Sequence, residues 1–217
     1  MKDLSRRNFL GLAAMAPSGA LLPGAAVGAA RTFAAATQAS ARARIQEQHL
    51  PNVPLVTQDG KRVRFYDDLV KGRIVTINFF YAQCEDVCPL VTANLVQVQK
   101  LLGDQVGRQV FMYSCTLKPE EDDVNAIKHH REMFGAGPGW TFLTGKPEDI
   151  ETLRKALGFT YPEPAIDQDK TQHIGNVRYG NEPLMLWAAC PGMAHASFIA
   201  ESISWMVRPD TNRVQKS

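Results

Sequence analysis

An almost unbroken apolar run, Arg73–Tyr81, leads directly into two cysteines, and few folds accommodate that order. Cys84 and Cys88 stand just after this run and before Pro89–Leu102, where apolar residues recur at helical spacing. The order predicts a buried strand, a loop that carries the thiols, and a helix that begins at or near Cys88. Backbone N–H groups at a helix N-terminus favour thiolate over thiol, and thiolates attack disulfides and bind soft metals. The sequence therefore predicts metal or redox chemistry at this loop.

The spacing of the two cysteines leaves two chemistries open. Residues at i and i+4 can share one helical face with Cβ atoms about 5–6 Å apart, which suits a shared metal ion. A disulfide needs Cβ atoms about 3.5–4.5 Å apart and requires the loop to adjust. A purely structural disulfide would close a very short loop and gain little from chain entropy. We therefore interpret Cys84 and Cys88 as a functional pair, either metal-binding or redox-active.

Strand and helix patterns alternate on both sides of the cysteines. Asp59-Gly60 marks a turn between two short β-prone stretches, and glycines or prolines bound the helical stripes. This pattern predicts an α/β protein with a central mixed β-sheet flanked by helices and an N-terminal β-hairpin. The predicted strands are Asn52–Val56, Lys61–Phe65, Arg73–Tyr81, Gln109–Cys115, Trp140–Leu143, Val177–Tyr179 and Leu184–Ala188, and the predicted helices are Pro89–Leu102, Pro119–Phe134, Pro147–Leu157 and His195–Val207.

The position of the cysteines narrows the fold further. They follow the carboxyl end of the first buried strand, which is the end at which open α/β sheets bind their ligands. A thioredoxin-like fold keeps its redox site at this place, so we expect that fold. Roughly 175 residues remain after the N-terminal segment, which is enough for one domain with its own core.

The N-terminus indicates export. Ser5–Leu10 contains a twin-arginine pattern, and a mildly apolar, alanine-rich stretch continues from Phe9 to Ala30. We predict a signal peptide and linker over residues 1–41, with cleavage between residues 29 and 41, and one domain over residues 42–217. The expected location is the periplasm, reached by the twin-arginine pathway. A retained N-terminal anchor is the alternative and would tether the domain to the membrane.

The charge of the chain gives no sign of nucleic-acid binding. Residues 1–41 hold Lys2, Arg6, Arg7 and Arg31 against Asp3, a net charge of +3, whereas the whole chain has a formal net charge of +2. The remainder is therefore close to −1 and contains no basic stripe.

With this order of strand, Cys-x-x-x-Cys-Pro loop and helix, the chain resembles the Sco/SenC family. The resemblance runs from about Val53 to Phe159, with a weaker match to the C-terminal helix. It implies a thioredoxin-like fold and a copper metallochaperone that assists assembly of the copper centre of cytochrome c oxidase. The segments that carry it are Asn78–Tyr81, Cys84–Pro89, Lys118–Asp122, Gly139–Trp140 and Leu143–Ile150.

The resemblance also implies a ligand set. Family members bind copper through both motif cysteines and one distant histidine, which places copper on Cys84, Cys88 and His173. His173 stands where the family has that histidine, after the helix Pro147–Leu157. Two thiolates and one imidazole suit Cu(I) and can also hold Cu(II). The implied partner is a cytochrome c oxidase subunit or another protein with a copper site.

A thiol–disulfide oxidoreductase is the alternative function. It would use Cys84 and Cys88 as a redox-active pair on partner cysteines and would not need His173. Dedicated oxidoreductases of this fold use Cys-x-x-Cys, so the longer spacer favours a metallochaperone over an enzyme. A peroxidase is disfavoured, because Tyr81 stands where peroxiredoxin-type sites place threonine or serine.

The remaining histidines and cysteines have plainer interpretations. His129 and His130 point about 100° apart on a helix, and we predict that they lie on its solvated face. Cys115 ends the second buried strand and is either a third thiol near the pair or a buried small hydrophobe. Cys190 either pairs with Cys115 or stays unpaired.

Overall fold

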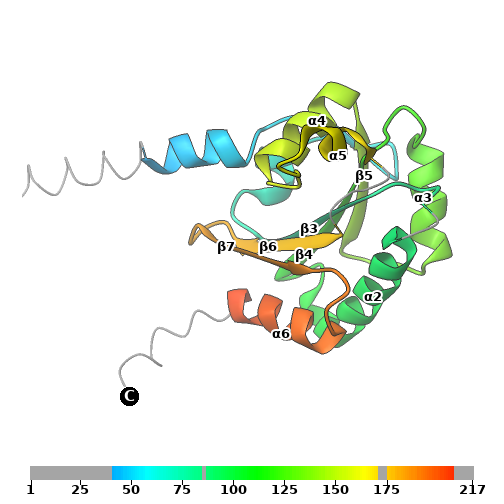
Figure 1. Cartoon of the computed structure of the whole chain (residues 1–217). Helices are drawn as coiled ribbons and strands as arrows, with labels where there is room; N and C mark the ends of the chain where they lie inside the picture. Colours follow the sequence, from blue (N-terminus) through cyan, green and yellow to red (C-terminus); the bar gives the residue numbers. More distant parts are fainter. Residues whose placement is uncertain (1–40, 85–86, 171–174, 208–217) are drawn as a thin grey trace, which may run out of the picture. The chain divides into compact units, whose positions relative to one another are not determined.

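The computed structural model describes residues 41–84, 87–170 and 175–207, and within them the strands form one seven-stranded sheet. The strands are β1 (Pro54–Thr57), β2 (Arg62–Arg64), β3 (Ile74–Phe80), β4 (Val110–Thr116), β5 (Trp140–Gly145), β6 (Asn176–Asn181) and β7 (Leu186–Pro191). Their order across the sheet is β2-β1-β5-β4-β3-β6-β7, and Figure 1 shows helices on both sides. The helices and helical turns are η1 (Phe65–Val70), α2 (Val87–Leu102), η2 (Gly103–Gln105), α3 (Val124–Met133), α4 (Pro147–Ala156), α5 (Pro164–Gln168) and α6 (Ala196–Val207).

The three central strands run parallel and end together. β3 pairs with β4 up to Phe80 and Thr116, and β4 pairs with β5 up to Cys115 and Leu143. β6 runs antiparallel to β3, β7 antiparallel to β6, and β1 antiparallel to both β2 and β5. The carboxyl ends of β3, β4 and β5 therefore meet at the sheet edge where the chain leaves β3 toward Cys84.

The two faces of the sheet bury separate apolar clusters, because successive strand residues point to opposite sides. Phe80 belongs to the cluster covered by α2, α3 and α6, whereas its neighbour Phe79 belongs to the cluster covered by η1 and α4. The run that ends in Phe79 and Phe80 is thus buried on both faces, as its composition predicts.

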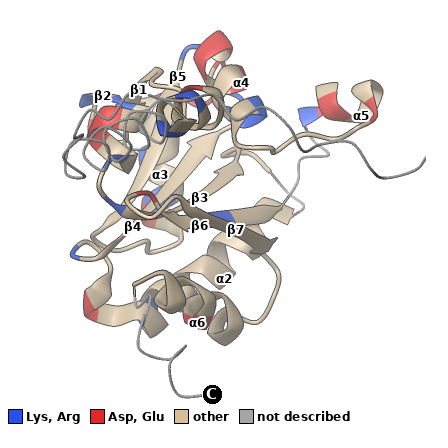
Figure 2. Cartoon of the chain, turned by 90° about the vertical axis from the view of Figure 1, so that its left-hand side faces the viewer, with Lys and Arg blue, Asp and Glu red and all other residues tan. Residues whose placement is uncertain are grey.

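Helices α2 and α6 carry far fewer charged residues than α4. α2 carries Lys100 and α6 carries Glu201 as its one charged residue, and Figure 2 shows both helices almost entirely tan. α4, in contrast, has acidic residues in its first turn and basic residues in its last turn. No helix in the described part of the chain is both long enough and apolar enough to span a bilayer.

The order of elements agrees with the sequence prediction, but α3 begins later than expected. The predicted start was Pro119, whereas the helix starts at Val124 with Asp123 as its N-cap, since the Asp123 side chain accepts the Ala126 N–H at 2.8 Å. Residues 119–122 form a turn instead, with the Asp122 N–H bonded to the Lys118 carbonyl at 2.8 Å. Glu120, Glu121 and Asp122 therefore lie before the helix and not in its first turn. The short helix α5 was not predicted, because five residues give no readable periodicity.

Candidate metal centre

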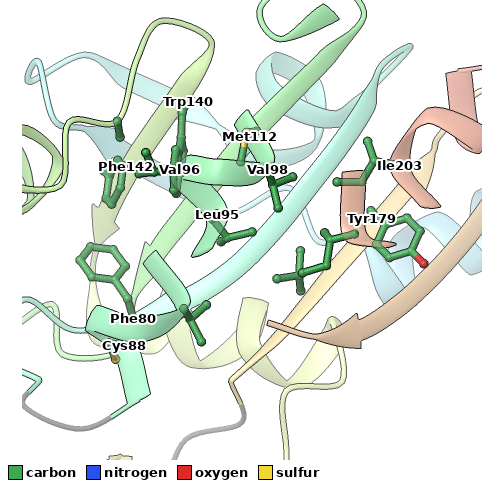
Figure 3. Packing of buried hydrophobic residues seen from close by; sticks show 14 of the residues in the cluster. Phe80, Cys88, Leu95, Val96, Val98, Met112, Trp140, Phe142, Tyr179 and Ile203 are labelled. Atoms are coloured by element: carbon green, nitrogen blue, oxygen red, sulfur yellow. The ribbon is translucent and has the colours of Figure 1, made fainter. Parts of the chain in front are cut away.

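Cys84 and Cys88 lie together where β3 ends and α2 begins. Cys88 stands in the first turn of α2, and the Cys84 N–H in the preceding loop donates to the Tyr81 carbonyl at 3.2 Å. The two side chains are hydrogen-bonded to each other, and the residues are only 6% and 1% exposed. Figure 3 shows Cys88 next to Phe80 at the border of the apolar cluster. The structure thus brings the predicted pair together as two soft donors shielded by apolar neighbours.

Burial controls the protonation of Cys88. Desolvation raises the pKa of the Cys88 thiol far above its ordinary value, and the hydrogen bond with Cys84 raises it further. The Tyr81 backbone lowers the pKa but does not offset burial. Desolvation thus acts against the thiolate form that the helix N-terminus is expected to favour at Cys88. Metal binding at Cys88 requires the loss of a proton.

The third predicted ligand, His173, lies outside the described residues. Among the residues that the structure describes, no three His, Cys, Asp or Glu side chains form a group that could hold a metal ion. The described chain resumes at Gly175, whose carbonyl accepts the Gly192 N–H at 2.7 Å. A Cβ placed on Gly175 would lie 3.2 Å from a Val87 methyl carbon, so Gly175 packs against the first turn of α2, beside Cys88.

Comparison with known proteins identifies the family. A sequence model described as SCO1/SenC matches residues 33–207, most of the chain. The chain belongs to the SCO1/SenC family. A Stutzerimonas stutzeri protein provisionally named a copper-binding protein is 27% identical over 134 residues, which cover 61% of this chain and 64% of that protein. The SCO1 homologue of Bacillus subtilis (strain 168) is 32% identical over 89 residues, 41% of this chain and 45% of that protein. The chain thus spans less than two thirds of the length of these relatives.

Solved structures show that this SCO1/SenC chain shares a fold with known members. A SCO1/SenC family lipoprotein from Bacillus anthracis str. Ames aligns with a TM-score of 0.62 at 22% identity, covering 74% of this chain and 96% of that one. Bradyrhizobium japonicum ScoI with copper bound aligns with a TM-score of 0.58 at 22% identity, covering 70% and 96%. The predictions of the family and of the thioredoxin-like fold are confirmed.

The other two cysteines of this family member lie in different apolar clusters. Cys115 is fully buried with Phe79 on the sheet face opposite Cys84 and Cys88, and burial raises its pKa to about 12. Cys115 is therefore a buried apolar side chain and not a third thiol of the pair. Cys190 pairs in register with Val177 and belongs to the same cluster as Cys88. Cys115 and Cys190 are both free thiols, so the disulfide left open between them is absent.

The prediction of a solvated helix face holds for His129 and is wrong for His130. His129 is exposed, whereas His130 is 2% exposed and packs against Phe80 and Phe134 with ring centroids 4.6 and 4.8 Å apart. The buried residues of α3 are Ile127 and His130, so the inward side of the helix includes His130. Burial lowers the pKa of His130 to about 4, while the nearby Ala82 backbone acts in the other direction.

Proposed function

We propose that this chain is an exported copper-binding protein, a metallochaperone that assists assembly of the copper centre of cytochrome c oxidase. The observation that carries the proposal is the hydrogen-bonded and buried pair of Cys84 and Cys88 at the ligand-binding edge of the sheet. Two kinds of relative support it. One is named as a copper-binding protein, and the Bradyrhizobium ScoI structure contains copper. The expected client is an oxidase subunit or another protein with a copper site.

His173 is the third ligand in this proposal. The support is its place in the sequence, two residues before Gly175, which packs against Val87 in the first turn of α2. Thiolates and imidazole form a soft donor set that suits Cu(I) and also holds Cu(II). Because the Cys88 thiol must release its proton first, uptake of copper is coupled to proton release and requires the reduced pair.

Titration of the reduced full-length chain with copper tests the ligand set. We expect one copper ion per chain, with affinity reduced roughly tenfold or more in each of Cys84→Ser, Cys88→Ser and His173→Ala. His129→Ala is the matched control, since His129 is exposed on α3, and it should bind copper as the parent does. Unchanged binding and an unchanged Cu(II) spectrum in His173→Ala would remove that residue from the site.

A thiol–disulfide oxidoreductase is the second candidate, because the Cys84 and Cys88 side chains already contact each other. In that case the pair reduces or oxidises partner cysteines, and His173 is dispensable. A disulfide-reduction assay separates the two functions. Full activity in His173→Ala together with no tight copper binding by the parent favours the oxidoreductase, whereas inert thiols at neutral pH exclude it.

We also propose that residues 1–41 direct the domain over residues 42–217 to the periplasm through the twin-arginine pathway. The sequence of Ser5–Leu10 supports the route, and the description of the Bacillus anthracis relative as a lipoprotein supports export alone. A double variant, Arg6→Lys with Arg7→Lys, should leave the protein in the cytoplasmic fraction. Arg31→Lys lies outside the twin-arginine pattern and is the control. Normal export of the double variant would contradict this route.

A further inference from the structure

The loop that carries Cys84 is held by a buried carboxylate. We call residues Tyr81–Cys84 the Cys84 loop. Just after β4, the Leu117 N–H donates to the carbonyl of Phe80, the last residue of β3, at 2.7 Å. The next outward N–H of the Cys84 loop, that of Ala82, donates to Oδ2 of Asp122 at 2.9 Å. The Asp122 side chain thus supplies the acceptor for the Ala82 N–H, beyond the end of the parallel β3–β4 pairing and two residues before Cys84.

Asp122 is itself fixed to the neighbouring strands. The Thr116 hydroxyl at the end of β4 donates to the same Oδ2 at 2.5 Å, and the Thr144 hydroxyl of β5 donates to the Asp122 carbonyl at 2.9 Å. The residue is only 2% exposed. A buried carboxylate is costly unless hydrogen bonds satisfy it, and here they link the ends of three strands through one side chain and its backbone. Asp122 is therefore held by hydrogen bonds to two strand ends and to the Cys84 loop.

The neighbouring Asp123 shows that Asp122 is not needed to start α3. The Asp123 side chain caps that helix by accepting the Ala126 N–H, whereas the Asp122 side chain turns inward to the Cys84 loop. Burial raises the pKa of Asp122, as expected for a carboxyl group placed inside the protein. Asp123 thus caps α3, and Asp122 holds the Cys84 loop. The two adjacent residues can therefore be compared as a matched pair in experiments.

We propose that Asp122 is a positioning residue that sets where Cys84 stands relative to Cys88. Cys88 is fixed by α2, so the separation of the two sulfur atoms depends on the Cys84 loop. A disulfide tolerates Cβ separations of only about 3.5–4.5 Å, and shared metal ligands need comparable accuracy. This role rests on the proposed function in taking Cys84 and Cys88 as the working pair. It does not depend on whether copper or a disulfide is the outcome.

The dithiol–disulfide equilibrium of the pair measures this positioning directly. The reduced full-length chain is equilibrated with mixtures of reduced and oxidised dithiothreitol. The Cys84 and Cys88 thiols give two electrons and two protons to the oxidised reagent, and alkylation followed by peptide mass reports the fraction oxidised. In Asp122→Leu, a loosened loop should make the pair harder to oxidise by about tenfold or more, a shift of about 30 mV in reduction potential. Asp122→Asn keeps an oxygen for the Ala82 N–H and should stay within about threefold of the parent.

Asp123→Ala is the control, because it removes the cap of α3 and lowers Tm without touching the Cys84 loop. It should leave the equilibrium within about twofold of the parent. An unchanged equilibrium in Asp122→Leu, or an equal shift in Asp123→Ala, would overturn the proposal.

Thr116→Val provides a second route if Asp122→Leu does not fold. It removes one donor to Oδ2, and a shift of about threefold or more is expected, with Thr116→Ser restoring the parent value. No shift in a folded Thr116→Val would count against the anchor. A separate copper titration of the parent decides the proposed function, so failure of copper binding and failure of the anchor give different results.

Discussion

The imidazole ring of His130 lies 4.6 Å from the ring of Phe80, centroid to centroid, in the apolar cluster beside α2. The Nε2 atom is 3.5 Å from the Thr92 hydroxyl, and Nδ1 has no hydrogen-bond partner among the described residues. A ring held in this way is neutral, and burial lowers the pKa of His130 to about 4. The unfolded chain, with an ordinary histidine pKa near 6.5, binds the proton more readily.

The His130 pKa predicts acid sensitivity. Since the folded pKa lies below the unfolded one, the stabilisation by neutral His130 is complete above about pH 6.5 and is lost as the pH falls toward about 4. The loss should reach at most about 3 kcal/mol in the free energy of unfolding. Urea unfolding at several pH values should show this slope in the parent and a flatter one in His130→Phe. The exposed neighbour gives the control, since His129→Phe should keep the parent slope.

The positions of the two histidines show what the sequence can and cannot predict. β3 could be predicted because its apolar run is long enough to mark a buried strand. α2 could be predicted because its apolar residues recur at helical spacing up to a glycine. The inward side of α3 could not, because polar His130 and Arg131 both border the stripe and periodicity alone does not rank them. Asp122 and Asp123 pose the same problem, since two identical residues take different roles that only the packing decides. The cysteine pair could be located from its place after β3, whereas the placement of His173 stays a prediction.

The Cys115 thiol should be unreactive in the folded protein. It is fully buried on the sheet face away from Cys84 and Cys88, and its pKa is raised to about 12. We expect no reaction with a charged thiol reagent until denaturant is added. Cys115→Ala should keep the copper stoichiometry of the parent and lower the free energy of unfolding by about 1 kcal/mol, because a small cavity replaces the sulfur. Lost copper binding in a folded Cys115→Ala would contradict its placement.

A buried polar chain joins the three parallel strands. The Ser114 hydroxyl donates to Oδ1 of Asn78 at 2.7 Å and accepts from Nε1 of Trp140 at 2.9 Å. Ser114→Ala leaves two buried polar groups without this partner, which should cost about 2–3 kcal/mol of unfolding free energy. Ser197→Ala, at an exposed position of α6, is the matched substitution and should change stability by less than about 0.5 kcal/mol. If Ser114→Ala and Ser197→Ala lowered the free energy of unfolding equally little in chemical denaturation, solvent would have to reach the hydrogen bonds of Ser114.

Arg154 links the segment after α4 to that helix through hydrogen bonds from its guanidinium group. Its guanidinium binds both carboxylate oxygens of Asp167 at 2.6 and 2.7 Å and also bonds to Glu151, while its side chain is 5% exposed. Asp167 and Glu151, whose side chains are 16% and 34% exposed, would lose charged hydrogen bonds, so Arg154→Met should cost about 2 kcal/mol. Hydrogen exchange should rise over residues 159–168, where Asp167 also accepts the Tyr161 N–H at 2.8 Å.

The same helix supplies the control for Arg154. Lys155 also contacts Glu151, at 3.2 Å, but its side chain is 61% exposed, so Lys155→Met should change the free energy of unfolding by less than about 0.5 kcal/mol. The hydrogen bonds from Arg154 lower the pKa of Asp167 and hold the pKa of Glu151 at about 2. Their contribution is therefore present above the ordinary carboxyl pKa of about 4 and is lost as the pH falls below it. Arg154→Met should remove this acid-dependent part as well, and a parent-like pH profile in that variant would show that Asp167 and Glu151 gain little from Arg154.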